Sequence, residues 1–246
     1  MERKVIPPKG GYPGGAAVRF IYRGEQKHLF LIPYVKGLVR EGERVRRLLE
    51  EARPEVLLLH ISPEELEGLK DLVENHRKVG REALSAADSV YLAVLEVYGE
   101  VELPSPSLRA ALEYGLRKGK PVKGVDISEA DFTELYLKHV SFLTRLRRDR
   151  ALKGALRYPL PPGRPQEALM ILDREVMKLK GFRTVESERM KWQGRAVFRE
   201  ALRWKRAAFL QEVERAEESL AELLRRAEKR GEAVEVERFP EEGQEE

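Results

Sequence analysis

Two short apolar runs on either side of a charged helical segment constrain the fold more than any other feature. Residues 28–35 and 55–61 have the length and composition of buried strands. Between them, residues 40–53 place four apolar side chains at helical spacing, and Pro54 ends that segment. Parallel strands need a crossover of this kind. The sequence therefore predicts a strand–helix–strand unit built into a mostly parallel sheet.

The rest of the first 130 residues continues this alternation. Residues 18–22 and 29–32 flank a glycine-containing turn and predict an N-terminal hairpin. Ser62 and Glu65 form a capping box around Pro63, so a helix should begin there. Residues 81–103 fit either an alternating strand or a helix, and we favour a helix with Asp88 as its candidate cap. A helix from residue 106 closed by Gly119 and a strand over residues 120–126 are also predicted.

Beyond Asp126 the pattern becomes helical. Ser128 caps a helix over residues 132–158, and a proline-rich break covers residues 159–165. The predicted elements after the break are a helix over residues 166–180 closed by Gly181, a long helix over residues 186–230 interrupted by Gly194, and a last edge strand over residues 233–239.

These elements predict an α/β fold: a mostly parallel sheet with crossover helices, an N-terminal hairpin and a long-helix C-terminal part. The expected domains are an α/β domain over residues 1–130, a helical part over residues 131–231 that packs on or projects from it, and an acidic tail over residues 232–246. The long helix could also pair with a second copy of the chain to form a homodimer.

Composition limits the class of protein. Charged residues make up 36% of the chain with a net charge of only +4, a balance typical of ion-pair-rich thermophilic proteins. The absence of cysteine excludes disulfides and thiolate metal sites. No apolar run approaches the roughly 20 residues that span a bilayer, and no signal peptide is recognisable. We therefore expect a cytoplasmic protein with no membrane partner.

Polar side chains fall near the carboxyl ends of the predicted strands, where open α/β sheets bind ligands. These residues are Tyr34, His60, Glu65 and Asp126. A histidine with two carboxylates could hold a metal or perform acid–base chemistry. The alternative is that these residues have no catalytic role, and we favour it. In that case His60 only ends a strand, Glu65 completes the helix cap and Asp126 caps the following turn. A ligand-binding crevice at the same place needs neither metal nor catalysis.

The order of the segments also carries a resemblance. Residues 31–36, 54–61, 104–111 and 125–127 follow one another as the motifs of a known family do. In this order the chain resembles the TraB/PrgY pheromone-shutdown proteins, relatives of Tiki-type metalloproteases and ChaN-like haem-binding proteins. The resemblance covers roughly residues 21–127 and implies the family's α/β fold.

The signature side chains of that family are replaced in this sequence. The replacements are Tyr34 for the histidine, His60 and Ser107 for two glutamates, and Glu65 and Ile127 for two arginines. Asp126 is retained, and residues 234–239 lack the family's late glycine–histidine motif. A histidine–carboxylate metal site cannot lose most of its ligands and keep its chemistry. The resemblance thus implies the fold and argues against the family's activity.

A basic segment offers a separate hypothesis. Five cationic side chains crowd one helical stretch: Arg145, Arg147, Arg148, Arg150 and Lys153. Such a stretch could bind a nucleic-acid backbone without sequence specificity, although a solvated helix surface is the favoured explanation.

The sequence leads to one main hypothesis and two alternatives. The main hypothesis is a TraB-like protein, without the family's activity, that binds an unknown ligand or protein partner. It would do so either in the crevice, through Tyr34, His60, Glu65, Ser107 and Asp126, or through its basic helices. The alternatives are a diverged metal-dependent hydrolase and non-specific nucleic-acid binding. The sequence identifies no cofactor and leaves open whether the protein is an enzyme.

Overall fold

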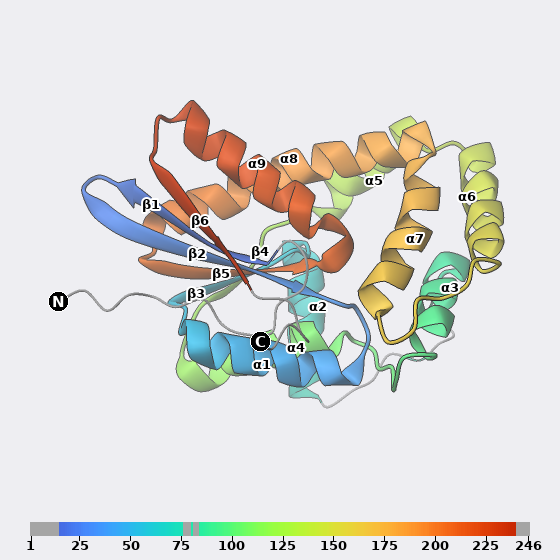
Figure 1. Cartoon of the computed structure of the whole chain (residues 1–246), viewed down its shortest axis with the longest axis horizontal. Coiled ribbons are helices and arrows are strands. Elements are labelled where there is room, and N and C mark those ends of the chain that lie inside the picture. Colours follow the sequence, from blue (N-terminus) through green and yellow to red (C-terminus); the bar gives the residue numbers. More distant parts are fainter. Residues whose placement is uncertain (1–14, 76–79, 81–83, 240–246) are drawn as a thin grey trace.

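The computed structural model describes residues 15–75, 80 and 84–239 (Figure 1). Its strands are β1 (Ala16–Tyr22), β2 (Glu25–Tyr34), β3 (Val56–Leu59), β4 (Val122–Gly124), β5 (Arg206–Glu212) and β6 (Val234–Arg238). Across the described residues they form one sheet in the order β4-β3-β5-β2-β1-β6. The first four strands in that order are parallel, while β1 is antiparallel to both neighbours. The predicted α/β class with a mostly parallel sheet is confirmed.

The predicted N-terminal hairpin is present. β1 and β2 are antiparallel, and their pairing extends from Tyr22 opposite Glu25 to Ala16 opposite Leu31. The two turn residues, Arg23 and Gly24, have φ of 52° and 77°. Positive φ at both positions gives a turn whose twist matches that of the flanking strands, and glycine adopts it without steric cost.

Helices cover both faces of the sheet (Figure 1). On one face lie α1 (Val39–Ala52) and α4 (Pro106–Lys118), with α2 (Pro63–Glu74) beside α4 and β4. On the other lie α8 (Lys180–Arg203) and α9 (Ala216–Lys229). Side chains alternate between two apolar cores, Phe30 and Ile32 facing one and Leu29 and Leu31 the other. Burial of both faces explains why these strands are apolar throughout.

A third group of helices lies beyond the carboxyl ends of the parallel strands. It contains α3 (Ala86–Leu95), α6 (Phe142–Ala155) and α7 (Pro165–Met177), at the right of Figure 1, with α5 (Glu129–His139) packed on α8. Their apolar core includes Leu95, Leu152 and Leu172 and reaches Val35 just after β2. This group closes the end of the sheet at which β2, β3 and β5 terminate.

The structure differs most from the sequence-based prediction at residues 206–212. They were expected to continue a helix over residues 186–230, but they form β5, between β2 and β3. Residues 207–210 are all buried, because helices cover both faces of the sheet at this strand. A strand buried on both faces lacks the alternation that marks an exposed strand, so its apolar residues also fit a helical stripe.

As a result, the predicted long helix is two helices, α8 and α9, joined through the central strand. The boundary predicted near residue 130 does not separate a sheet from a helical part, because β5 and β6 both come from beyond it.

Smaller corrections concern helix ends. Gly181 and Gly194 lie inside α8 and neither ends nor interrupts a helix. The helix predicted over residues 132–158 is divided into α5 and α6, since Ser141 caps a new helix. Ser85, not Asp88, caps α3; its hydroxyl accepts a hydrogen bond from the Asp88 amide at 3.1 Å.

Other predicted ends are confirmed. Ser62 Oγ accepts from the Glu65 amide at 3.0 Å, and Glu65 Oε2 accepts from the Ser62 amide at 2.8 Å. Gly119 closes α4 with φ of 60°. No helix in the described part of the chain is both long enough and apolar enough to cross a bilayer.

Candidate functional site

The parallel strands end beside a cavity of about 870 Å³. Its walls come from the segments after β2, β3 and β5 and from α2, α3, α4, α7 and α8. Because all three strands are parallel, their carboxyl ends bring together residues that are far apart in the sequence. The cavity therefore occupies the position at which this class of fold binds ligands.

The end of β2 is fixed by a buried ion pair at the start of α1. Glu41 Oε2 accepts hydrogen bonds from the Val35 amide at 3.1 Å and from Arg44 Nε at 3.2 Å. The Arg44 guanidinium also donates to the carbonyl oxygen of Pro33. These bonds hold the main chain at Pro33 and Val35, the residues before and after Tyr34, and so fix the position of Tyr34 at the strand end.

A histidine–glutamate contact lies at the centre of the strand ends. His60 Nε2 is 3.4 Å from Glu212 Oε1, and Lys36 Nζ is 3.7 Å from the same oxygen. The hydroxyl of Tyr34, which is fully buried, lies 3.4 Å from His60 Nε2. Burial alone would raise the pKa of Glu212, but Lys36 and His60 outweigh it and hold that pKa well below its usual range. Glu212 is therefore an ionised carboxylate at neutral pH.

Two arginines form a second network along the wall made by α7 and α8. Arg189 pairs with the Asp126 carboxylate and, through Nη1, with Glu186 Oε1 at 2.9 Å. Arg215 donates from Nη1 to Asp173 Oδ2 at 2.7 Å, and its Nε lies 3.5 Å from Glu186 Oε2. Glu186 therefore links the two arginines, and both guanidinium groups are already engaged by carboxylates.

Four polar atoms of the cavity lining are buried and lack hydrogen-bond partners among the described residues: Ser105 Oγ, Arg189 Nε, Gln193 Nε2 and Glu214 Oε2. Glu214 Oε2 is buried and unpartnered, as is Gln193 Nε2, whose residue is only 2% exposed. Gln193 Oε1 is occupied, since it accepts from Gln211 Nε2 at 2.9 Å. Burial raises the pKa of Glu214 to about 8, with the negative charge of Glu212 adding to the effect. Buried polar groups without partners are uncommon in native proteins, and here they face a cavity that could hold a ligand.

The structure places the five predicted binding residues unequally. His60 and Glu65 line the cavity, whereas Tyr34 is not part of the lining but contacts His60. The carboxylate of Asp126 is held by Arg189 and also accepts from the Ile127 amide at 2.8 Å. Ser107 is fully buried in the first turn of α4 and is not part of the cavity lining. Ser107 is thus the one predicted residue that the fold separates from the cavity and its immediate partners.

The cavity also contains functional candidates that sequence reasoning missed. They are Lys36, Asp173, Glu186, Arg189, Gln193, Gln211, Glu212, Glu214 and Arg215. Most lie in the segment expected to be one long helix, where charged residues looked like a solvated surface. The usable signal was the apolar run over residues 207–210, which ends in Gln211 and Glu212 as a buried strand at a ligand-binding edge would.

A metal centre finds little support in these contacts. Among the described residues, no group of three or more histidine, aspartate or glutamate side chains is placed to share a metal ion. Of the three side chains considered from sequence, Glu65 is engaged by the Ser62 amide and Asp126 by Arg189.

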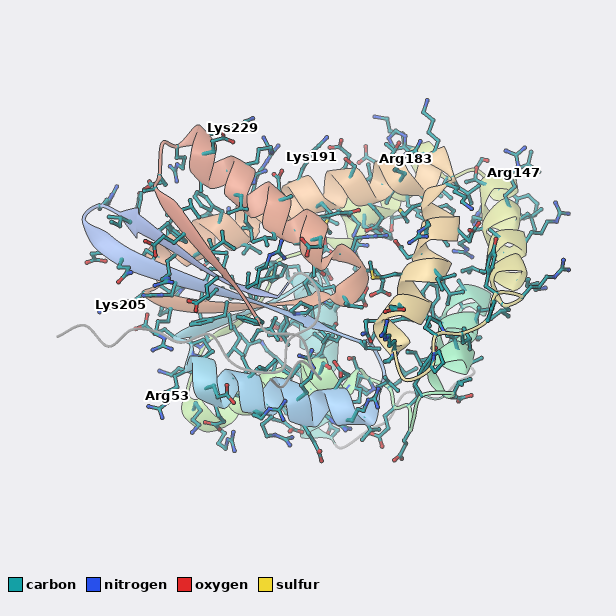
Figure 2. The ribbon with its side chains drawn as sticks, viewed as in Figure 1. Arg53, Arg147, Arg183, Lys191, Lys205 and Lys229 are labelled. Atoms are coloured by element: carbon teal, nitrogen blue, oxygen red, sulfur yellow. The ribbon has the colours of Figure 1, made fainter. Side chains whose placement is uncertain are left out.

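The predicted basic segment is α6, at the outer side of the molecule (Figure 2). Arg145, Arg147, Arg150 and Lys153 are exposed. Arg148 instead pairs with Asp149 at 2.9 Å and lies over the Phe182 ring, and Arg145 lies over the ring of Phe142. Figure 2 shows Arg147 directed away from the body of the protein.

Comparison with known proteins adds no assignment: no family model matches the chain, and no curated protein matches it. The function is therefore inferred from the geometry of the cavity.

Proposed function

We propose that this protein binds a small organic ligand in the cavity at the carboxyl ends of β2, β3 and β5. The observation that carries the proposal is a group of four buried, unpartnered polar atoms in the lining of a cavity of about 870 Å³, among them Glu214 Oε2 and Gln193 Nε2. An empty hydrogen-bond donor and acceptor in one wall are expected where a ligand supplies the missing partners.

The shape and lining of the cavity support this proposal. Small-molecule sites typically occupy about 300–1,000 Å³ and combine apolar walls with a few placed polar groups. Apolar side chains from three helices contribute here, with Leu92 and Leu95 on α3, Leu169 and Val176 on α7, and Met190 on α8. The polar groups come from the strand ends, with Lys36, His60 and Glu212, and from the same helices, with Asp173 on α7 and Arg189 on α8.

We further propose that the chain is a diverged relative of the TraB/PrgY family that has given up the family's metal-dependent chemistry. The order of elements over residues 21–127 supports the relationship. The replacement of the signature residues, including Tyr34, His60 and Glu65, supports the loss of activity. The central late strand, β5, ends in Gln211 and Glu212 and carries no glycine–histidine pair.

Thermal unfolding against a panel of small metabolites tests ligand binding, because a ligand that binds only the folded state raises the midpoint. The matched variants are Met177→Trp, which fills the cavity, and Met170→Trp, on the same helix but outside the lining. At least one compound should stabilise wild type and Met170→Trp but not Met177→Trp. Equal stabilisation of both variants, or none by any compound, would contradict the proposal.

The hydrolase alternative has its own test. Metal-stripped protein is unfolded with and without manganese, cobalt or zinc, and compared with His60→Ala and Asp126→Ala. We expect no midpoint shift in any of the three proteins. A shift in wild type that both substitutions abolish would restore the hydrolase hypothesis and justify a substrate screen.

A further inference from the structure

We infer that the ligand of this cavity carries a protonated amine, which pairs with the carboxylate of Glu214, next to an apolar body held by α3 and α7. The inference rests on the proposed ligand-binding function and adds the chemical class of the ligand.

The charge of the lining favours a cation. Among the described residues, seven carboxylate side chains line the cavity: Glu65, Asp71, Asp88, Asp173, Glu186, Glu212 and Glu214. Three cationic side chains do so: Lys36, Arg189 and Arg215. Each of the three is already within ion-pair distance of a carboxylate. An anionic ligand would therefore meet uncompensated negative charge, whereas a cation would reduce it.

Glu214 is the carboxylate with an open position. Its neighbour Arg215 directs its guanidinium to Asp173, and it bonds to Glu214 only through the main-chain carbonyl oxygen at 3.2 Å. Glu214 Oε2 has no hydrogen-bond partner among the described residues. Glu212, in contrast, already has Lys36 and His60 beside it. An ammonium group entering the cavity would find its unfilled acceptor at Glu214.

Other residues of the cavity lining indicate what further groups the ligand carries. Gln193 Nε2 has no hydrogen-bond partner among the described residues and could donate to a hydroxyl or carbonyl oxygen of the ligand. Leu92, Leu95 and Leu169 offer an apolar surface for a hydrocarbon chain or ring. An amine with an apolar body and one oxygen acceptor would satisfy all three features.

Binding of such an amine should be linked to a proton. Glu214 holds its proton up to a pH of about 8, because burial and Glu212 oppose its ionisation. Asp173 opposes it too, whereas Arg215 favours it; Tyr34, Lys36 and Tyr91 also lie within electrostatic reach. An ammonium ion selects the ionised carboxylate, so each binding event below that pH should release a proton.

The test compares three probes with one hydrocarbon chain and different head groups: hexylamine, 1-hexanol and hexanoate. Isothermal titration calorimetry of the whole chain should detect binding of hexylamine and at least about tenfold weaker binding of the other two. Affinity for hexylamine should rise by up to about tenfold per pH unit from pH 6 to pH 8. Titrations in buffers of different ionisation enthalpy should report proton release.

Two variants assign the effect to Glu214. Glu214→Gln keeps the shape and removes the charge, so at pH 8 hexylamine should bind at least about tenfold more weakly than to wild type, and its affinity should not depend on pH. Glu228→Gln, at an exposed position on α9, should behave as wild type. Tighter binding of 1-hexanol or hexanoate, or unchanged hexylamine binding by Glu214→Gln, would overturn the amine assignment.

The outcome also distinguishes this inference from the proposed function. If the metabolite panel yields ligands that Met177→Trp excludes but none is an amine, the cavity binds ligands and the amine assignment is wrong. If neither the panel nor the three probes binds, both proposals are wrong.

Discussion

The two ends of the central strands use charged residues differently. At the amino ends, Glu55 accepts from the Lys205 amide at 2.8 Å, and the Arg206 guanidinium donates to the carbonyl oxygen of Ala52. At the carboxyl ends, Glu212, Glu214 and Arg215 face a cavity and interact mainly with other charged side chains. Figure 2 shows Arg53 and Lys205 at one side of the molecule and Arg147, on α6, at the other.

This difference separates two roles for buried charge. A side chain that bonds to the main chain of a neighbouring element joins secondary structures and has no free capacity for a ligand. A side chain that faces a cavity and depends on other charges keeps a titratable group within reach of a ligand. Mutations at the amino end should therefore change stability alone, whereas mutations at the carboxyl end should change stability, titration and ligand binding.

The largest expected effect is at Arg215, the most heavily paired cation of the cavity wall. Arg215→Leu should lower the free energy of unfolding by about 3 kcal/mol, because it leaves the partly buried Asp173 carboxylate without its partner and removes one of the two arginines that pair with Glu186. Urea denaturation measures the loss. Arg183→Leu, at an exposed position of α8, serves as the control and should change stability by less than about 0.5 kcal/mol.

Glu214→Gln should stabilise the free protein at alkaline pH. The pKa of Glu214 is raised to about 8, so the folded state holds a proton that the unfolded state loses near the ordinary glutamate pKa. Stability therefore falls as pH rises through this window and levels off above pH 8. The variant should lack this fall and exceed wild type by about 2 kcal/mol or more at pH 8. Parallel stability–pH curves for the two proteins would contradict the assignment.

The amino end should show a smaller and purely structural response. Glu55→Gln removes the charge that accepts from the Lys205 and Arg206 amides and should cost about 1 kcal/mol in urea denaturation. Ligand affinity should not change, because Glu55 lies at the other end of the strands. A loss of ligand binding that exceeds the loss of stability would remove the distinction between the two ends.

The smallest effect on stability is expected on α6. Replacing Arg147, Arg150 and Lys153 by glutamine should change the free energy of unfolding by less than about 0.5 kcal/mol, because these side chains are exposed.

The same variant tests the nucleic-acid alternative by titration of duplex DNA at several salt concentrations. We expect no salt-dependent binding by wild type; binding whose salt slope falls by about 3 in the variant would support that alternative.

Local sequence rules predicted much of the fold but only part of the candidate site. Ser62, Pro63 and Glu65 specify a helix start within four residues, and the structure contains it. Tyr34, His60 and Asp126 were expected near strand ends because each follows an apolar run, and the structure places them there. Glu212 and Glu214 could not be predicted in the same way, because the apolar residues of β5, which precedes them, fit a helical stripe as well as a strand.

What the sequence determined by itself is the set of features that depend on neighbouring residues: the hairpin, the capping box, the strand–helix–strand unit and the α/β class. Only the tertiary structure decided that β5 lies at the centre of the sheet. A run of apolar residues predicts that a segment is buried, but it does not predict which strands pair with it. Glu212 meets His60 only because β5 lies beside β3. Contacts of such long sequence separation arise from packing, so the cavity and its unpartnered carboxyl become visible only in the folded chain.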